Sequence, residues 1–210
     1  MRGMPLAVSS PNKGIPGLWE KMYSGIMKTQ LIPSPTCGRI LLLITPDSLT
    51  RVLFEMVARL ALRGPLYVLD GGNTFQGYPL ARTLRRQTMD IAGVMQQVLL
   101  SRAFTCYQMA VLLGEEPLAP HPVLVLDFLA TFYDQGVRIA ERRRLLLTCL
   151  QQLKRLSQNA PVAVWVRQRQ VIPQEALGFL EIVQASADQV WRPERLPAAS
   201  LSQPALLPGL

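Results

Sequence analysis

The sequence predicts an α/β fold: a single domain with a mostly parallel sheet and helices on both faces. Wholly apolar runs at residues 40–45, 66–69 and 123–126 are each followed by polar or turn-forming residues. Strands without polar alternation are typical of a sheet that is covered on both sides. Alternation of such strands with helical patterns favours parallel connections. In sheets of this kind, functional groups gather at the carboxyl ends of the strands.

The expected strands cover residues 40–45, 66–70, 98–104, 123–127 and 162–166, with a further edge strand at 189–191. Helices are expected at residues 49–62, after the third strand as far as residue 114, and at residues 137–157. The first of these stops before Gly64-Pro65. The last carries an apolar stripe with helical spacing, formed by Leu146, Leu150, Leu153 and Leu156.

A length of 210 residues suits one domain with short tails. Residues 1–36 are rich in Pro, Gly and Ser and are predicted to form a tail and lead-in segment, with one amphipathic stretch at 18–27. Residues 37–196 form the expected core, and residues 197–210 a flexible tail. Hydrophobic residues make up 49% of the chain and charged residues 17%, which argues against extensive disorder.

The formal net charge of +8 favours an anionic partner, either nucleic acid or a membrane surface, although a generally basic surface is the simpler alternative. Cys37, Cys106 and Cys149 are isolated, which indicates a reducing compartment without a zinc site. His121 lies between two prolines and is expected in a loop rather than as a catalytic base. The sequence lacks a membrane-spanning run or a signal peptide, so we expect a cytoplasmic protein.

Five segments, in the correct order, resemble the RecA/RadA recombinase ATPases. Residues 67–75 look like the family's "Y-I-D-T-E-G-T-F" turn, and residues 101–108 like "A-R-A-F/Y-x-x-x-H-Q". Residues 123–133 resemble the Walker B strand, and residues 162–168 are similar to "V-A-V-V-I-T-N-Q". Residues 181–190 are similar to the late "H-x-S-x-x-R-L" strand. The resemblance covers residues 38–192 and implies a RecA-like core.

The turn that would carry the Walker A loop departs from this pattern. A phosphate loop needs glycine amides, a lysine and a hydroxyl residue. Residues 45–51 have no glycine and no lysine; Pro46 lacks an amide donor, and Asp47 adds a negative charge. Ser48 or Thr50 could replace the magnesium-binding hydroxyl and Arg51 the lysine, but neither replacement restores the cradle.

The resemblance implies further losses at three positions. Gly72 stands where the family has the glutamate that positions the attacking water. Asp127 keeps the Walker B position, where it is either a structural strand cap or a remnant of the metal site. Gln168 matches the glutamine that senses the nucleotide. We therefore expect a degenerate nucleotide site with no catalytic residues, cofactor or metal.

In the recombinases, the loops after the fourth and fifth strands contact DNA, and here both loops are short and carry arginines. The candidate phosphate contacts are Arg138, Arg142, Arg143, Arg144, Arg167 and Arg169. The alternative is a solvated helix face. Cations at a helix N-terminus oppose its dipole, so changing Arg142 and Arg143 to Gln is expected to leave folding intact. The N-terminal lead has no F-x-x-A hook for joining subunits.

These observations lead to three hypotheses. The first is a non-catalytic pseudo-ATPase that acts as an accessory factor in DNA repair or recombination. It would bind DNA, a RecA-family or other protein partner, or both, and it would be nucleoid-associated if it binds DNA. The second is a P-loop-less interaction module or inhibitor of the cell-division-inhibitor type, without DNA binding. The third is an active ATPase with an unusual phosphate loop.

Overall fold

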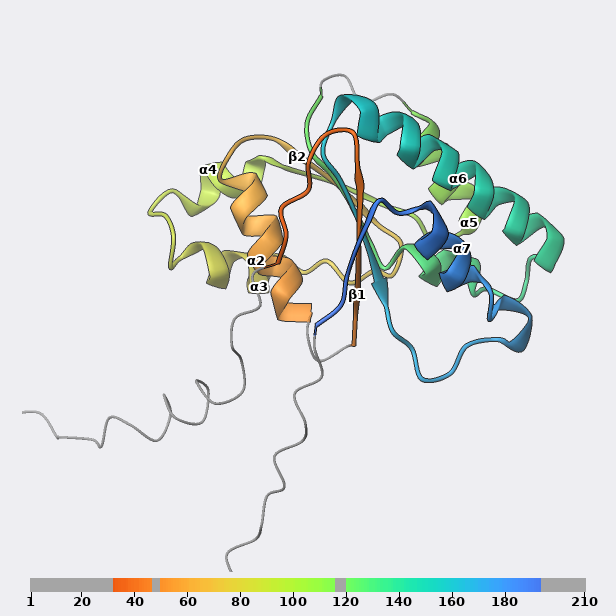
Figure 1. Cartoon of the computed structure of the whole chain (residues 1–210). Helices are drawn as coiled ribbons and strands as arrows, with labels where there is room; N and C mark the ends of the chain where they lie inside the picture. Colours follow the sequence, from red (N-terminus) through yellow and green to blue (C-terminus); the bar gives the residue numbers. More distant parts are fainter. Residues whose placement is uncertain (1–31, 47–49, 116–119, 194–210) are drawn as a thin grey trace, which may run out of the picture. The chain divides into compact units, whose positions relative to one another are not determined.

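A parallel sheet runs through the described part of this computed structural model, which comprises residues 32–46, 50–115 and 120–193 (Figure 1). All strand pairings in that part are parallel, and the strand order is β3-β2-β4-β5-β1-β6. The strands are β1 (Ile40–Thr45), β2 (Leu66–Asp70), β3 (Val98–Arg102), β4 (Val123–Leu126), β5 (Val162–Arg167) and β6 (Gln189–Trp191).

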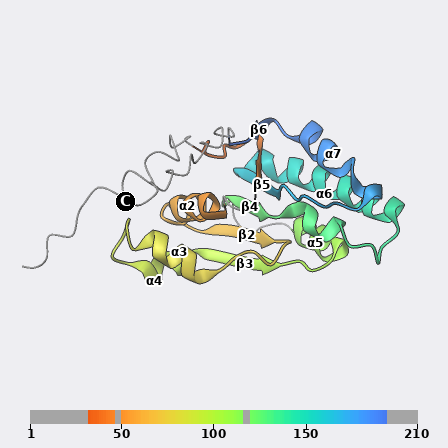
Figure 2. The ribbon, with the colours of Figure 1, turned by 90° about the horizontal axis from the view of Figure 1, so that it is seen from below.

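Helices cover both faces of the sheet, and Figure 2 shows the two groups edge-on. One face carries α2 (Thr50–Ala61), α3 (Gly77–Leu84) and α4 (Ile91–Gln96). The other carries α5 (Cys106–Gly114), α6 (Ile139–Asn159), α7 (Phe179–Ser186) and the 3-10 helices η2 (Phe128–Phe132) and η3 (Gln174–Ala176). The predicted α/β class is confirmed, and the arrangement is consistent with a RecA-like fold.

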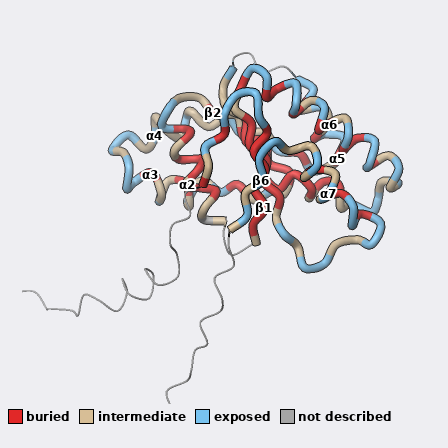
Figure 3. The backbone as a smooth tube through the Cα atoms, in the orientation of Figure 1, coloured by how far each residue is buried: buried red, intermediate tan, exposed pale blue. Residues whose placement is uncertain are grey.

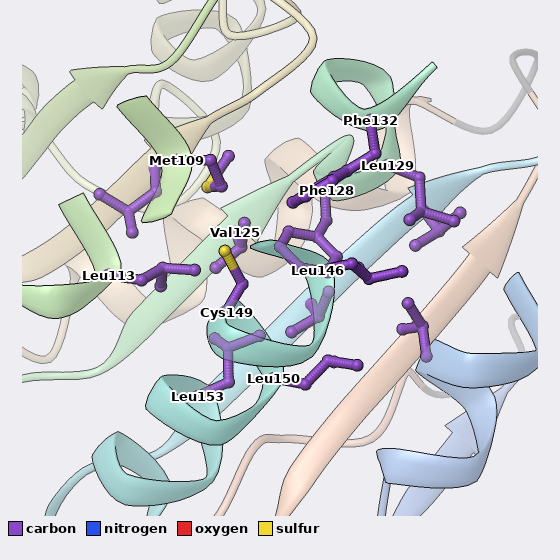
Figure 4. Packing of buried hydrophobic residues seen from close by; sticks show 14 of the residues in the cluster. Met109, Leu113, Val125, Phe128, Leu129, Phe132, Leu146, Cys149, Leu150 and Leu153 are labelled. Carbon is purple, nitrogen blue, oxygen red and sulfur yellow. The ribbon is translucent and has the colours of Figure 1, made fainter. Parts of the chain in front are cut away.

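The apolar runs of the sequence form the buried centre of the sheet (Figure 3). All six side chains of β1 and all four of β4 are buried, as expected for strands covered on both faces. On the α6 face, the predicted stripe of leucines packs against η2 and α5 (Figure 4). All four of its members are buried: Leu146, Leu150, Leu153 and Leu156.

Two elements end earlier than the sequence predicted. β3 stops at Arg102, because Thr105 caps α5 by accepting a hydrogen bond from the Gln108 backbone N–H. β4 stops at Leu126, because Asp127 adopts a left-handed conformation with φ 46°. The long helix is shifted by two residues at each end, to Ile139–Asn159.

Other elements were missed or assigned wrongly. Helices α3 and α4 lie between residues 75 and 97, for which the sequence reading made no prediction. The segment that resembled a late recombinase strand is mostly helix α7, since Phe179 and Val183 bury one helical face, and only residues 189–191 pair as a strand. None of the helices among the described residues is long and apolar enough to cross a membrane.

Candidate functional site

The carboxyl ends of four neighbouring strands bring together Thr45, Asp70, Asp127 and Arg167. Thr45 at the end of β1 pairs in register with Arg167 at the end of β5, and Asp70 at the end of β2 with Leu126. Asp127 directly follows β4, which lies between β2 and β5. We call this group, with Gly72 and Arg169, the strand-end site. Its position agrees with the expectation for a parallel sheet.

Asp127 is the buried centre of this site. Its side chain is 1% exposed, and one oxygen, Oδ2, lies 2.7 Å from Nη2 of Arg167 and 3.1 Å from Nη2 of Arg169. The second oxygen, Oδ1, is also buried and accepts no hydrogen bond from the described residues. A buried carboxylate needs such counter-charges, because desolvation penalises an unpaired ion by several kcal/mol. The acid that the resemblance places at the Walker B position is therefore neutralised by two arginines of the protein.

Aromatic rings hold both arginines beside the carboxylate. The guanidinium of Arg169 lies 5.5 Å from the ring centroid of Tyr133, and that of Arg167 lies 5.7 Å from the ring of Trp165. Burial raises the pKa of the Tyr133 phenol to about 12, so this ring is neutral beside its cation at pH 7. Arg167 and Arg169 are 25% and 35% exposed. The two predicted phosphate contacts are thus largely directed inward, towards Asp127.

Gly72 gives the Asp127 side chain its space. A Cβ atom at position 72 would lie 2.4 Å from Oδ2 and 2.6 Å from Cβ of Asp127, closer than real Cβ contacts occur. The backbone of Gly72 does not have a positive φ, so the reason for glycine here is steric. The resemblance places the water-positioning glutamate at this position. That space is filled by the Asp127 side chain.

Asp70 organises the turn that carries Gly72. Its buried carboxylate accepts hydrogen bonds from the backbone N–H groups of Gly72 (3.2 Å), Thr74 (3.0 Å) and Phe75 (2.8 Å). Arg102 contributes an ion pair at 3.7 Å. Asn73 in the same turn has φ 51°, a conformation that asparagine tolerates better than most residues. Asp70 therefore acts as a structural cap of this turn.

The end of β1 is also occupied by protein contacts. The buried hydroxyl of Thr45 accepts a hydrogen bond from the indole N–H of Trp165 at 2.9 Å, and its carbonyl accepts from the backbone N–H of Gln168 at 2.8 Å. Pro46 is half-buried, and the Gln168 side chain is exposed. The remaining predicted positions of this turn, Asp47 and Ser48, lie outside the described residues.

The described residues of the strand-end site do not fit a magnesium ion. Magnesium requires near-octahedral oxygen ligands and usually keeps several waters. Here a single carboxylate is available at Asp127, because Asp70 is committed to its own turn, and two guanidinium groups already occupy the shared oxygen. No group of three or more His, Cys, Asp or Glu side chains that could hold a metal occurs in the described ranges.

The arginines at the start of α6 have different environments. Arg138 and Arg143 are exposed, whereas Arg144 pairs with Glu141 through two hydrogen bonds of 2.7 and 2.8 Å. Arg142 is 1% exposed; it donates a hydrogen bond to the Phe132 carbonyl oxygen at 3.2 Å and pairs with Glu175. The expectation that Arg142 contacts phosphate is wrong in this conformation, because its side chain joins η2 to η3 inside the protein.

The same placement corrects the expected effect of changing Arg142. Arg142→Gln should lower the free energy of unfolding by about 2 to 4 kcal/mol, because it leaves the Phe132 carbonyl and Glu175 without their partner. The neighbouring exposed change Arg143→Gln should stay within about 0.5 kcal/mol of the wild type. Urea unfolding followed by circular dichroism measures both. Equal stabilities of the two variants would contradict this role of Arg142.

Comparison with known proteins does not identify a family or a function for this site. No family model matches the chain. The search of curated proteins likewise finds no match. The resemblance to the recombinase ATPases therefore stays a prediction from the five segments.

Proposed function

We propose that the protein is a non-catalytic RecA-like pseudo-ATPase that acts as an accessory factor in DNA repair or recombination. It would bind DNA, a recombinase-type partner, or both. The observation that carries the proposal is the closed strand-end site, in which Arg167 and Arg169 neutralise Asp127 and the Asp127 side chain fills the space beside Gly72. Phosphoryl transfer depends on positioning and on charge stabilisation by metal and protein groups. These residues provide neither.

Excess positive charge supports binding to nucleic acid. The chain carries a formal charge of +8, and Arg138 and Arg143 are exposed beside the short loop that follows η2. No acidic partner for either side chain occurs in the described part of the chain. Exposed cations of this kind bind phosphates without regard to sequence.

An apolar edge supports the alternative, a P-loop-less interaction module without DNA binding. β3 is an edge strand and exposes Leu99 (43%) and Leu100 (37%), while Phe104 (65%), Tyr107 (47%) and Val111 (61%) are exposed on the segment that follows. An unpaired strand edge with apolar side chains is a template for strand addition by another chain. This edge is where we expect a protein partner.

The deciding experiment measures both kinds of binding in one preparation. We expect labelled single- or double-stranded oligonucleotides to bind in fluorescence anisotropy, with affinity falling as salt increases. Arg138→Gln with Arg143→Gln should reduce the slope of log affinity against log salt by about 1.4 to 1.8. Arg63→Gln is the matched control, because Arg63 is exposed between α2 and β2, near the amino end of β2, whereas Arg138 and Arg143 follow the carboxyl end of β4.

Capture of protein partners from a nuclease-treated extract distinguishes the DNA-binding accessory factor from the interaction module. Loss of capture on changing Leu99 and Phe104 to Ser, with no DNA binding by the wild type at low salt, would favour the interaction module. Absence of both kinds of binding would contradict the proposal.

A further inference from the structure

A concave site separate from the strand-end site lies near the carboxyl ends of β1 and β2, on the α2–α3 face of the sheet. A pocket of about 380 Å³ opens between the first turns of α2, the loop after β2 and helix α3, and its lining includes Phe54, Thr74 and Tyr78. None of Asp127, Gln168 or the arginines that face Asp127 lines it. Its volume lies in the range of small-ligand sites.

Cations stand at the rim of this pocket. Arg82 and Arg86, four residues apart, both line it and are exposed. Residues 71–89 contain three arginines and no acidic residue, and no described carboxylate pairs with any of the three. Among the described residues, Arg82 and Arg86 therefore have no acidic partner, in contrast to Arg142, Arg144, Arg167 and Arg169.

The lining of the pocket combines aromatic rings with hydrogen-bond acceptors. Phe54 is buried in the wall and Tyr78 is 71% exposed. The Thr74 hydroxyl donates its proton to Asp70 at 3.2 Å, and the Thr83 hydroxyl donates to the Pro79 carbonyl at 3.0 Å. Because each hydroxyl has already donated its proton, its oxygen can only accept a hydrogen bond from a ligand. Acceptors and cations in one lining complement the N–H edge of a nucleobase and its attached phosphate.

We infer that this α2–α3 pocket binds one nucleotide unit of a single-stranded nucleic acid. Arg82 and Arg86 hold the phosphate, the exposed ring of Tyr78 stacks on the base, and Thr74 and Thr83 accept hydrogen bonds from the base edge. A base must leave its duplex partner to enter a pocket, so single strands bind in preference to duplexes. This inference rests on the nucleic-acid part of the proposed function and adds to the exposed α6 arginines, Arg138 and Arg143, a site for one base and its phosphate.

The test uses the full chain and a fluorescein-labelled 15-nucleotide oligo-dT in a salt series. Arg82→Gln and Arg86→Gln should each reduce the slope of log affinity against log salt by about 0.7. Arg85→Gln is the matched control, since Arg85 is exposed beside them without lining the pocket, and should leave the slope unchanged. Tyr78→Ala should weaken oligo-dT binding about five- to 150-fold. Circular dichroism verifies that each variant is folded.

Cross-linking locates the base directly. Irradiation of an oligo-dT that contains 5-iodouracil should attach it to the peptide bearing Tyr78. Binding by the wild type with equal effects of the Arg82, Arg85 and Arg86 changes would overturn the pocket and leave the proposed nucleic-acid binding in place. If poly-glutamate displaced the labelled oligo-dT as effectively as unlabelled oligo-dT does, recognition of the base would be overturned. Absence of wild-type binding at low salt would overturn both this pocket and the nucleic-acid part of the proposed function.

Discussion

Replacing Arg167 and Arg169 together with Met should lower the free energy of unfolding by about 3 to 5 kcal/mol, because the change strands a buried carboxylate. The Asp127 side chain is 1% exposed, and both of its ionic contacts come from these two residues. Methionine keeps most of the apolar stem of arginine and removes only the charged end. The urea midpoint should therefore fall by about 1 to 3 M, with little change in slope.

Asp127→Asn should restore most of this loss in the triple variant. The amide carries no charge that needs a counter-ion, and asparagine tolerates the left-handed φ of 46° at this position. Alone, Asp127→Asn should cost only about 1 to 2 kcal/mol, because the two arginines are partly exposed and water can solvate them. Oligonucleotide or partner binding should be nearly unchanged in this variant.

The control pair is Arg138→Met with Arg143→Met, the same chemical change at two exposed positions, which should cost less than about 1 kcal/mol. A double-mutant cycle measures the coupling between Asp127 and the arginine pair. Additive losses in the triple variant would show that the buried ion pair does not stabilise the fold.

Most of the sheet could be predicted, because a strand that is buried on both faces has a continuous run of apolar residues. The runs at 40–45, 66–70 and 162–166 contain almost no polar residue, and each forms a strand close to the predicted bounds. α3 and α4 were missed because they have eight and six residues, and α3 contains Pro79. The burial of Leu80 and Leu84, four residues apart, is the helical signal that was present.

The strand-end site could be located from the sequence, but its internal pairing could not. Arg169 pairs with Asp127 across 42 positions of the sequence, and Arg142, outside this site at the start of α6, pairs with Glu175 across 33 positions. Helical spacing did contain one clue: Arg142 lies four residues before Leu146, on the apolar stripe of α6. A cation on a buried stripe indicates a buried partner rather than a phosphate contact.

Gly72→Ala should lower the free energy of unfolding by about 2 to 4 kcal/mol, although alanine fits the backbone conformation at this position. The added Cβ would lie 2.4 Å from Oδ2 and 2.6 Å from Cβ of Asp127, and a Cβ atom cannot move aside as the end of a flexible side chain can. Gly77→Ala is the matched control five residues later. There the new Cβ meets only the methyl end of Met95, at 3.5 Å, and stability should hold or rise slightly.

The decisive comparison places Gly72→Ala in an Asp127→Gly background. Glycine suits the positive φ at position 127 and removes all three clashing atoms, so the alanine should then cost less than about 1 kcal/mol. Gly72→Glu, which restores an acid where the resemblance implies one, should destabilise further through repulsion between two adjacent carboxylates. ATP hydrolysis should stay at the buffer level in the wild type and in this variant. An unchanged cost of Gly72→Ala in the Asp127→Gly background would refute the steric coupling, and turnover by Gly72→Glu would show that the nucleotide site can still open.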